Sequence, residues 1–245
     1  MSFFGLRFRT FNNSNDIDLI YGIPHQTLDS WQWTLQQILA LKPDHLSLYA
    51  LGLEEGTPLR DWVQQGRLPV PDEDLAADMY DLATDMLDEH GFAQYEISNW
   101  AKPGHACRHN LQYWRNLPYI GLGPGAHGYA DNVRYWTILG PKRYIEVLQD
   151  MNGQWEFPRT PAIDEANIVR RDDEISETLI MSLRLTQEGV DRQLFRQRFG
   201  QDLLEIHGPV IEKYVRYGLL EVDEHRVRLT KRGRLLSNTV FRDLV

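Results

Sequence analysis

The residues whose side chains could bind a ligand or take part in a reaction are concentrated between Tyr95 and Tyr129. His105, Cys107 and His109 occupy alternate positions, and imidazole and thiolate groups are the usual ligands of zinc. In an extended strand, alternate side chains point to one side. No second Cys or His tract completes a tetrahedral site, so zinc is a minor hypothesis for this segment.

A haem suits the surrounding residues better than zinc does. A porphyrin requires an axial His or Cys, flat aromatic walls, and cations for its propionates. The alternative is purely structural, with the polar residues satisfying irregular backbone and the aromatic residues filling a core. The residues that could serve either role are His109 as iron ligand with Cys107 as its rival, Asn110, Tyr113 and Trp114 beside it, and Arg108 and Arg115 as cations.

A glycine-rich segment follows, from Tyr119 to Gly128. Glycine allows backbone to approach a ligand closely, but this Gly-x-Gly-x-Gly spacing is not the dinucleotide fingerprint. We therefore expect a tight turn here and a structural role for His127.

Composition excludes several classes of protein. The 245 residues carry a net charge of -9, which argues against a main partner that is a polyanion. Cys107 is the single cysteine, so the chain forms no internal disulfide and cannot hold a cluster on three or four of its own thiolates. No apolar run approaches the roughly 20 residues that cross a bilayer, and the first residues do not resemble a secretory signal, so we expect a cytoplasmic protein.

The first half of the chain predicts an α/β fold. Asp18–Tyr21 and His45–Leu53 have the composition of buried strands, and the apolar spacing after Thr27 predicts a helix between them. Strand, helix, strand implies a parallel sheet with a ligand site near the carboxyl ends of its strands. The other expectations are an irregular lead-in over 1–15, a loop over 54–71, a helix from Asp72 to about Gly91 with Leu75, Met79, Leu82 and Met86 inward, a strand over 92–97, and irregular structure over 98–131.

The second half predicts a small helical module. A helix from Pro141 to about Met151 precedes a linker, Gly153–Asp164, that we interpret as a domain boundary. Two predicted helices, a hairpin over 219–229 and a final helix over 231–244 are typical of a winged-helix arrangement. The face of the first helix is Ile168, Ile175, Leu179 and Leu183, and the face of the second is Leu203, His207, Val210, Ile211 and Tyr214.

A winged helix could meet DNA, so its charge matters. From Pro209 onward there are eight basic and five acidic residues, a net charge of +3. The interspersed acids favour a solvated face over a nucleic-acid surface.

Several motifs, in series, resemble one family from Asp16 onward. They are DLIYGIPHQT at 18–27, PDHLSLYAL at 43–51, YEISNW at 95–100, HNLQYW at 109–114 and GLGPGAH at 121–127. They look like those of the HemW-type haem chaperones, relatives of the oxygen-independent coproporphyrinogen III oxidases in the radical S-adenosylmethionine superfamily.

This resemblance implies a fold and a site. Asp18–Tyr21 and His45–Leu51 would be the last two strands of a six-stranded partial barrel. His109, Asn110, Tyr113 and Trp114 match the family's haem-binding signature. Asp18 would contact S-adenosylmethionine, and Ala50 would lie beside its adenosine.

The chain also departs from the family. It lacks the Cys-x-x-x-Cys-x-x-Cys loop that holds a [4Fe-4S] cluster, so we expect neither the cluster nor S-adenosylmethionine to bind this chain. The strand at Asp18 would have an unpaired edge, which favours self-association or docking with a separately encoded N-terminal half.

The sequence thus predicts an α/β partial-barrel remnant over 1–152 with a haem-binding segment, followed by a helical, winged-helix-like domain over 153–245 that resembles the HemN C-terminal domain. The favoured function is haem binding and delivery to haem-accepting proteins. The alternatives are a coproporphyrinogen oxidase-like enzyme and, less favoured, a winged-helix nucleic-acid binder.

Overall fold

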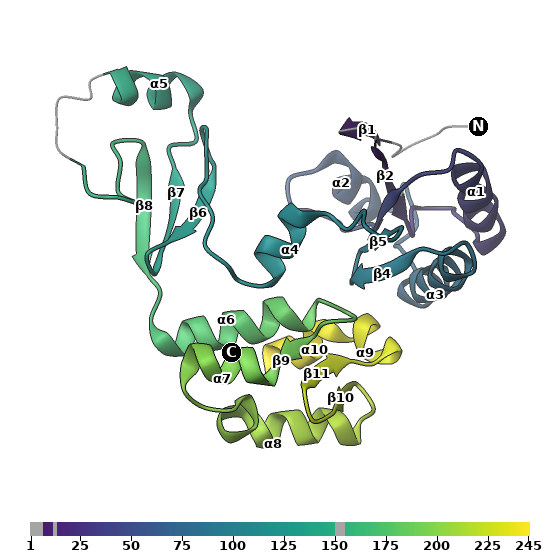
Figure 1. Cartoon of the computed structure of the whole chain (residues 1–245). Coiled ribbons are helices and arrows are strands. Elements are labelled where there is room, and N and C mark those ends of the chain that lie inside the picture. The colour runs from purple at the N-terminus through teal and green to yellow at the C-terminus, as the bar shows by residue number, and fades with distance from the viewer. Residues whose placement is uncertain (1–6, 12–13, 150–154) are drawn as a thin grey trace. The chain divides into compact units, whose positions relative to one another are not determined.

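A computed structural model describes residues 7–11, 14–149 and 155–245. The chain divides into two compact units, which meet between Ala106 and Cys107. The domain boundary expected at residues 152 and 153 lies outside the described residues, and so does the end of the helix expected to reach Met151. Among the described residues, the N-terminal unit has one sheet and the C-terminal unit has two, and each unit has its own helices (Figure 1).

The N-terminal unit is built on a five-stranded sheet in the order β1-β2-β3-β5-β4. The parallel pair predicted from the sequence is present, because β2 lies parallel to β3 from Asp16–His45 to Tyr21–Ala50. The other neighbours are antiparallel. The strands are β1 (Arg7–Phe11), β2 (Ser14–Tyr21), β3 (His45–Ala50), β4 (Ala93–Glu96) and β5 (Asn99–Ala101).

The start of the chain corrects two expectations. Part of the lead-in expected to be irregular forms β1, which pairs with β2 from Arg7–Asp18 to Phe11–Ser14. The strand at Asp18 therefore has a partner on the edge that was expected to be open. Strand pairing satisfies the backbone groups that would otherwise recruit another chain.

Helices α1 (Leu28–Ala40) and α3 (Glu73–Glu89) cover one face of this sheet (Figure 1). Each starts at a capping residue that the sequence predicted: Thr27 accepts from the Ser30 N–H, and Asp72 accepts from the N–H groups of Asp74 and Leu75. A third helix, α2 (Pro58–Gln64), lies in the stretch that was expected to be a loop. The buried residues of α3 are Met79, Tyr80, Ala83 and Leu87. Of the inward face expected from the sequence, Met79 is buried, whereas Leu75, Leu82 and Met86 are partly buried against the core.

The C-terminal unit begins with α4 (Arg108–Trp114) and a three-stranded antiparallel sheet in the order β6-β7-β8. Helix α4 and strand β6 lie in the segment 98–131 that was expected to be irregular, and β8 begins within the expected linker, Gly153–Asp164. Ile168 ends β8 and is 69% exposed, so it does not belong to a buried helical face as expected. The elements are β6 (His127–Ala130), β7 (Val133–Thr137), α5 (Pro141–Gln149) and β8 (Ile163–Ile168).

The remaining elements form the helical, winged-helix-like module that the sequence predicted. A hairpin of β10 and β11 joins β9 in a second three-stranded sheet. The final segment is two short helices where one was expected. The elements are α6 (Arg171–Leu183), β9 (Val190–Asp191), α7 (Arg192–Phe199), α8 (Leu203–Arg216), β10 (Leu220–Val222), β11 (Arg226–Leu229), α9 (Lys231–Leu235) and α10 (Ser237–Arg242).

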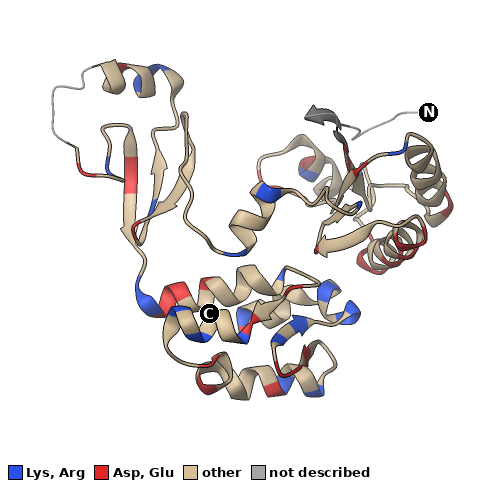
Figure 2. Ribbon diagram, in the orientation of Figure 1, with Lys and Arg blue, Asp and Glu red and all other residues tan. Residues whose placement is uncertain are grey.

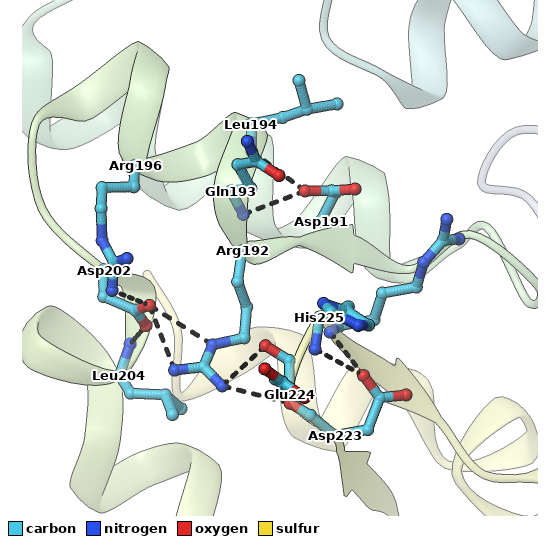
Figure 3. Close-up of polar contacts among 11 residues, drawn as sticks. Asp191, Arg192, Gln193, Leu194, Arg196, Asp202, Leu204, Asp223, Glu224 and His225 are labelled. Carbon is cyan, nitrogen blue, oxygen red and sulfur yellow. Dashed lines mark hydrogen bonds and ion pairs between the residues drawn. The ribbon is translucent and has the colours of Figure 1, made fainter.

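A buried carboxylate ties this module together. Figure 3 shows Asp202 between the guanidinium groups of Arg192 and Arg196, at 3.2 and 2.7 Å. Asp202 also caps α8 through the Leu204 N–H, and Arg192 reaches the backbone carbonyls of the hairpin turn. Burial opposes ionisation, but the Leu204 N–H and Arg192 together lower the pKa of Asp202. The carboxylate therefore joins α7, α8 and the hairpin as an ionised group.

Charges in this module are mixed in sign, as Figure 2 shows. Arg228 of the hairpin pairs with Glu221 and Asp223, and Lys213 pairs with Asp243. Compensated cations favour the solvated-face interpretation over a nucleic-acid surface. Within the described part of the chain, none of the helices has the length and apolarity to span a membrane.

Candidate functional site

The predicted haem segment is the short helix α4. Cys107 is its N-cap residue, with extended backbone geometry, and its side chain makes no capping hydrogen bond. The thiol is half-buried, whereas Arg108 and His109 are exposed. Residues 105, 107 and 109 do not form a strand, so their side chains are not placed on one side as a strand would place them. The metal site considered on that basis is therefore wrong. Among the described residues, no three His, Cys, Asp or Glu side chains are placed to hold a metal ion.

One face of α4 carries a stack of aromatic rings. His109 and Tyr113 are four residues apart on the helix, and their ring centroids lie 4.6 Å apart at 81°. Tyr113 in turn meets Tyr119 edge to face, at 4.5 Å and 81°. The exposed imidazole is thus backed by two tyrosine rings, and Tyr119 is a member of this site that sequence reasoning did not assign.

The neighbouring face of α4 packs on the C-terminal helices. The guanidinium of Arg184 lies 4.4 Å from the centroid of the Trp114 ring, and Ser182 Oγ donates to the Trp114 carbonyl at 3.3 Å. The Trp114 Nε1 atom is buried without a hydrogen-bond acceptor. Asn110, one helical turn earlier, is half-buried. The structure therefore brings His109 and Tyr113 together and places Trp114 against α6.

The pKa of Tyr119 is raised, as expected for a tyrosine that is partly buried behind Tyr113. Burial raises the pKa of the Tyr119 hydroxyl, and the positive charge of Arg134 opposes this effect. The hydroxyl is therefore neutral at physiological pH, and the backbone of Tyr119 pairs with Tyr129 of β6.

The residues matched to S-adenosylmethionine binding lie in the other unit. Asp18 is half-buried on β2, opposite Ser47 of β3, and Ala50 is exposed at the carboxyl end of β3. Ala50 stands three residues beyond Ser47, which is about 10 Å along a strand. The two residues thus lie at different heights on a pair of parallel strands.

A buried histidine stands beside Asp18 on the same sheet. His45 is 5% exposed, and its Nε2 atom lies 2.9 Å from the Tyr95 hydroxyl. Burial lowers the pKa of His45, although the carboxylates of Asp16 and Asp18 oppose this effect. The imidazole is thus held neutral next to two acidic side chains, an arrangement that the sequence did not reveal because it depends on strand register.

Comparison with known proteins finds relatives that match nearly the whole of this chain. The HemN C-terminal domain matches residues 169–236. "Heme chaperone HemW" of Bacillus subtilis is 35% identical over 92% of this chain and 57% of its own length, and that of Mycobacterium tuberculosis is 36% identical over 94% and 55%. The chain matches the C-terminal part of HemW-type proteins.

The HemW-type resemblance extends to a mitochondrial protein and to one solved structure. "Radical S-adenosyl methionine domain-containing protein 1, mitochondrial" of Mus musculus is 35% identical over 94% of this chain and 52% of its own length. The coproporphyrinogen III oxidase (HemN) of Escherichia coli superposes with a TM-score of 0.71 at 21% identity, over 94% of this chain and 54% of that one. This likeness confirms the predicted fold, a radical S-adenosylmethionine barrel remnant with a helical domain.

The chain spans about half the length of the curated HemW-type relatives that it matches. It corresponds to a C-terminal part of such a protein, since it includes the HemN C-terminal domain.

The glycine-rich segment is shaped by close contacts within the chain itself. A Cβ added at Gly121 would lie 2.2 Å from the His127 carbonyl oxygen, and one at Gly128 would lie 2.1 Å from the Tyr135 ring. Tyr135 is buried, and its hydroxyl accepts the Gly121 N–H at 3.3 Å. These glycines are thus required for packing. His127, also predicted to be structural, is an exposed residue at 5.8 Å from the Trp136 ring.

We expect Gly128→Ala to destabilise the C-terminal unit by about 1–3 kcal/mol, because the buried Tyr135 ring cannot move far enough to admit a methyl group. Gly140→Ala is the control, since a Cβ there meets nothing within 4 Å, and its effect should stay within about 0.5 kcal/mol. Thermal unfolding measures both. Equal midpoints for the two variants would contradict the packing role of Gly128.

Proposed function

We propose that this chain binds haem through α4, with His109 as the iron ligand, and that it takes part in haem delivery; its HemW-type relatives are named haem chaperones. The observation that carries the proposal is the exposed His109 imidazole, backed at 4.6 Å by Tyr113. An axial ligand must be reachable by the iron, and a packed aromatic ring limits the rotamers of the imidazole that it touches.

The other predicted residues support different aspects of the proposal. Tyr113 offers an aromatic surface on the same side as His109, whereas Trp114 contacts Arg184 and Ser182 and so orients the helix. Asn110 is half-buried. Arg108 is exposed at the start of α4 and could meet a propionate. Cys107 remains the rival ligand, two residues before His109.

Partners are part of the same proposal. A protein that delivers haem must meet haem-accepting proteins, and a C-terminal part of a HemW-type chain would dock with an N-terminal half or self-associate. S-adenosylmethionine and a [4Fe-4S] cluster belong to the family and are not expected on this chain, so Asp18 and Ala50 would be remnants of a pocket. A cytoplasmic location stays a prediction.

A coproporphyrinogen oxidase-like enzyme is the second candidate. It has less support, because the relatives that cover the chain at 35% and 36% identity are named haem chaperones, whereas the oxidase is 21% identical and shows the fold alone.

The ligand assignment predicts a spectral result. On titration with ferric haem, His109→Ala should remove most of the haem-induced absorbance change, whereas Cys107→Ser should alter it less, because an exposed imidazole is easier to reach than a half-buried thiol. The Soret maximum distinguishes imidazole from thiolate ligation. A spectrum that is lost in Cys107→Ser and kept in His109→Ala would assign the iron to the thiolate.

Binding should be weaker than in a full-length relative. A pocket held by part of its scaffold must be ordered on binding, and this cost reduces the affinity.

A further inference from the structure

The chain leaves α4 through a buried asparagine that contacts three other elements of the C-terminal unit. Asn116 is 3% exposed and has a left-handed backbone, with φ of 47°. Its amide nitrogen donates to Thr178 Oγ1 of α6 at 3.0 Å, and its amide oxygen accepts from Arg134 of β7 at 3.0 Å. Its backbone carbonyl accepts from Arg198 of α7 at 3.0 Å. Each polar end of the buried amide thus has a partner.

Arg134 connects this asparagine to the aromatic stack. The guanidinium of Arg134 forms a bidentate ion pair with Glu177 of α6, with Nε at 3.2 and 3.1 Å from the two carboxylate oxygens. The same guanidinium lies 4.7 Å from the centroid of the Tyr129 ring. Tyr129 is joined to Tyr119 by two backbone hydrogen bonds, and the Tyr119 ring packs on Tyr113. A continuous set of contacts therefore runs from Glu177 through Arg134, Tyr129, Tyr119 and Tyr113 to His109.

A helix as short as α4 depends on such contacts for its orientation. It has seven residues, and isolated helices below about 12–15 residues are marginal in water. The Asn116 N–H bonds to the Tyr113 carbonyl at 2.8 Å, so the asparagine closes the C-terminal end of α4. His109 lies near the opposite end and is exposed. Its orientation is thus set from the far end of the helix.

We propose that Asn116 and Arg134 are positioning residues, which orient His109 for haem through the Tyr113–Tyr119 stack without contacting haem themselves. This inference rests on the proposed function. Thr178, Glu177 and Arg198 all lie within residues 169–236, which match the HemN C-terminal domain. That domain would then determine the geometry of the iron ligand, which gives it a role in haem binding.

Asn116→Gly tests this most cleanly. Glycine adopts the left-handed backbone of residue 116 without strain, so the turn is kept while both side-chain bonds are lost. We expect the affinity for ferric haem to fall about fivefold to tenfold, as expected for the loss of roughly one net hydrogen bond. We also expect the Soret maximum to shift, because a less restricted imidazole populates more than one ligation geometry.

The matched control is Asn132→Gly. Asn132 also has a left-handed backbone, with φ of 56°, but it is exposed in the β6–β7 turn. This variant should match the wild type in both affinity and spectrum. If Asn116→Gly fails to fold, Tyr119→Leu replaces it, because this variant removes the ring that supports Tyr113 and should give the same spectral change.

The outcomes separate this inference from the function on which it rests. If wild type and His109→Ala bind haem equally, the proposed ligand is wrong and the positioning role falls with it. If His109→Ala loses the haem-induced absorbance change but Asn116→Gly, or Tyr119→Leu in its place, matches the wild type, the proposed function stands and the positioning role is overturned. Weaker binding with an unchanged Soret maximum would show a loss of stability only, and would overturn it as well.

Discussion

After anaerobic reconstitution with iron and sulfide, this chain is expected to contain no [4Fe-4S] cluster and to produce no 5'-deoxyadenosine from S-adenosylmethionine. The reason lies in its ligands: the 245 residues include one cysteine, and such clusters are held by several thiolates. The half-buried Cys107 at the start of α4 cannot replace three ligands. Assays of iron, acid-labile sulfide and 5'-deoxyadenosine measure the result.

A relative that carries the three-cysteine loop of the family is the positive control for the same protocol. Sulfide bound to this chain near the cluster stoichiometry, together with 5'-deoxyadenosine, would show that another ligand set exists. Addition of a separately produced N-terminal half that bears the loop should restore cluster binding to the mixture.

Trp31→Ala is expected to lower the free energy of unfolding of the N-terminal unit by about 3–5 kcal/mol, as large-to-small changes of buried aromatic residues do. Trp31 is 1% exposed, and its Nε1 atom donates to the Met79 carbonyl at 2.9 Å. Its ring also lies 5.6 Å from that of Tyr21, so α1, α3 and β2 meet at this side chain. Its removal leaves both a cavity and an unpaired carbonyl group.

Trp33 provides a matched control on the same helix. It is 44% exposed, so Trp33→Ala should change the free energy of unfolding by no more than about 0.5 kcal/mol. Urea denaturation followed by circular dichroism compares the two variants. Similar losses in both would show that the core of the N-terminal unit is not organised around Trp31.

The elements that the sequence predicted best are those whose signals are local. Thr27 and Asp72 cap α1 and α3 as expected, and the apolar spacing of Trp31, Leu35 and Ile38 gives the buried face of α1. Capping and helical periodicity act within a few residues, so they can be recognised without knowledge of the fold.

The elements that were missed depend on distant contacts. Helix α4 has no side-chain cap and no fully buried residue, and it is oriented by Trp114 on Arg184 and by Asn116 on Thr178. Strand β1 pairs with β2, a contact that its own composition did not reveal.

The candidate site was predicted in part. The motif named His109, Asn110, Tyr113 and Trp114, and the helix places the first and third of these on one face. The motif did not reveal that Trp114 packs against α6, nor that the Tyr119 ring packs on Tyr113. Tyr119 follows Tyr113 by six residues, and the chain turns between them at Asn116, which has a left-handed backbone.

Haem binding by His109 on α4 can be measured as the equilibrium affinity for ferric haem. The dissociation constants of wild type and His109→Ala should be compared with that of His127→Ala, which removes another exposed histidine beside an aromatic ring of the same unit. We expect saturable binding by wild type and His127→Ala, and an affinity at least about tenfold lower for His109→Ala, which corresponds to about 1.4 kcal/mol. Equal affinities in wild type and His109→Ala, or no saturable binding by wild type, would contradict this expectation.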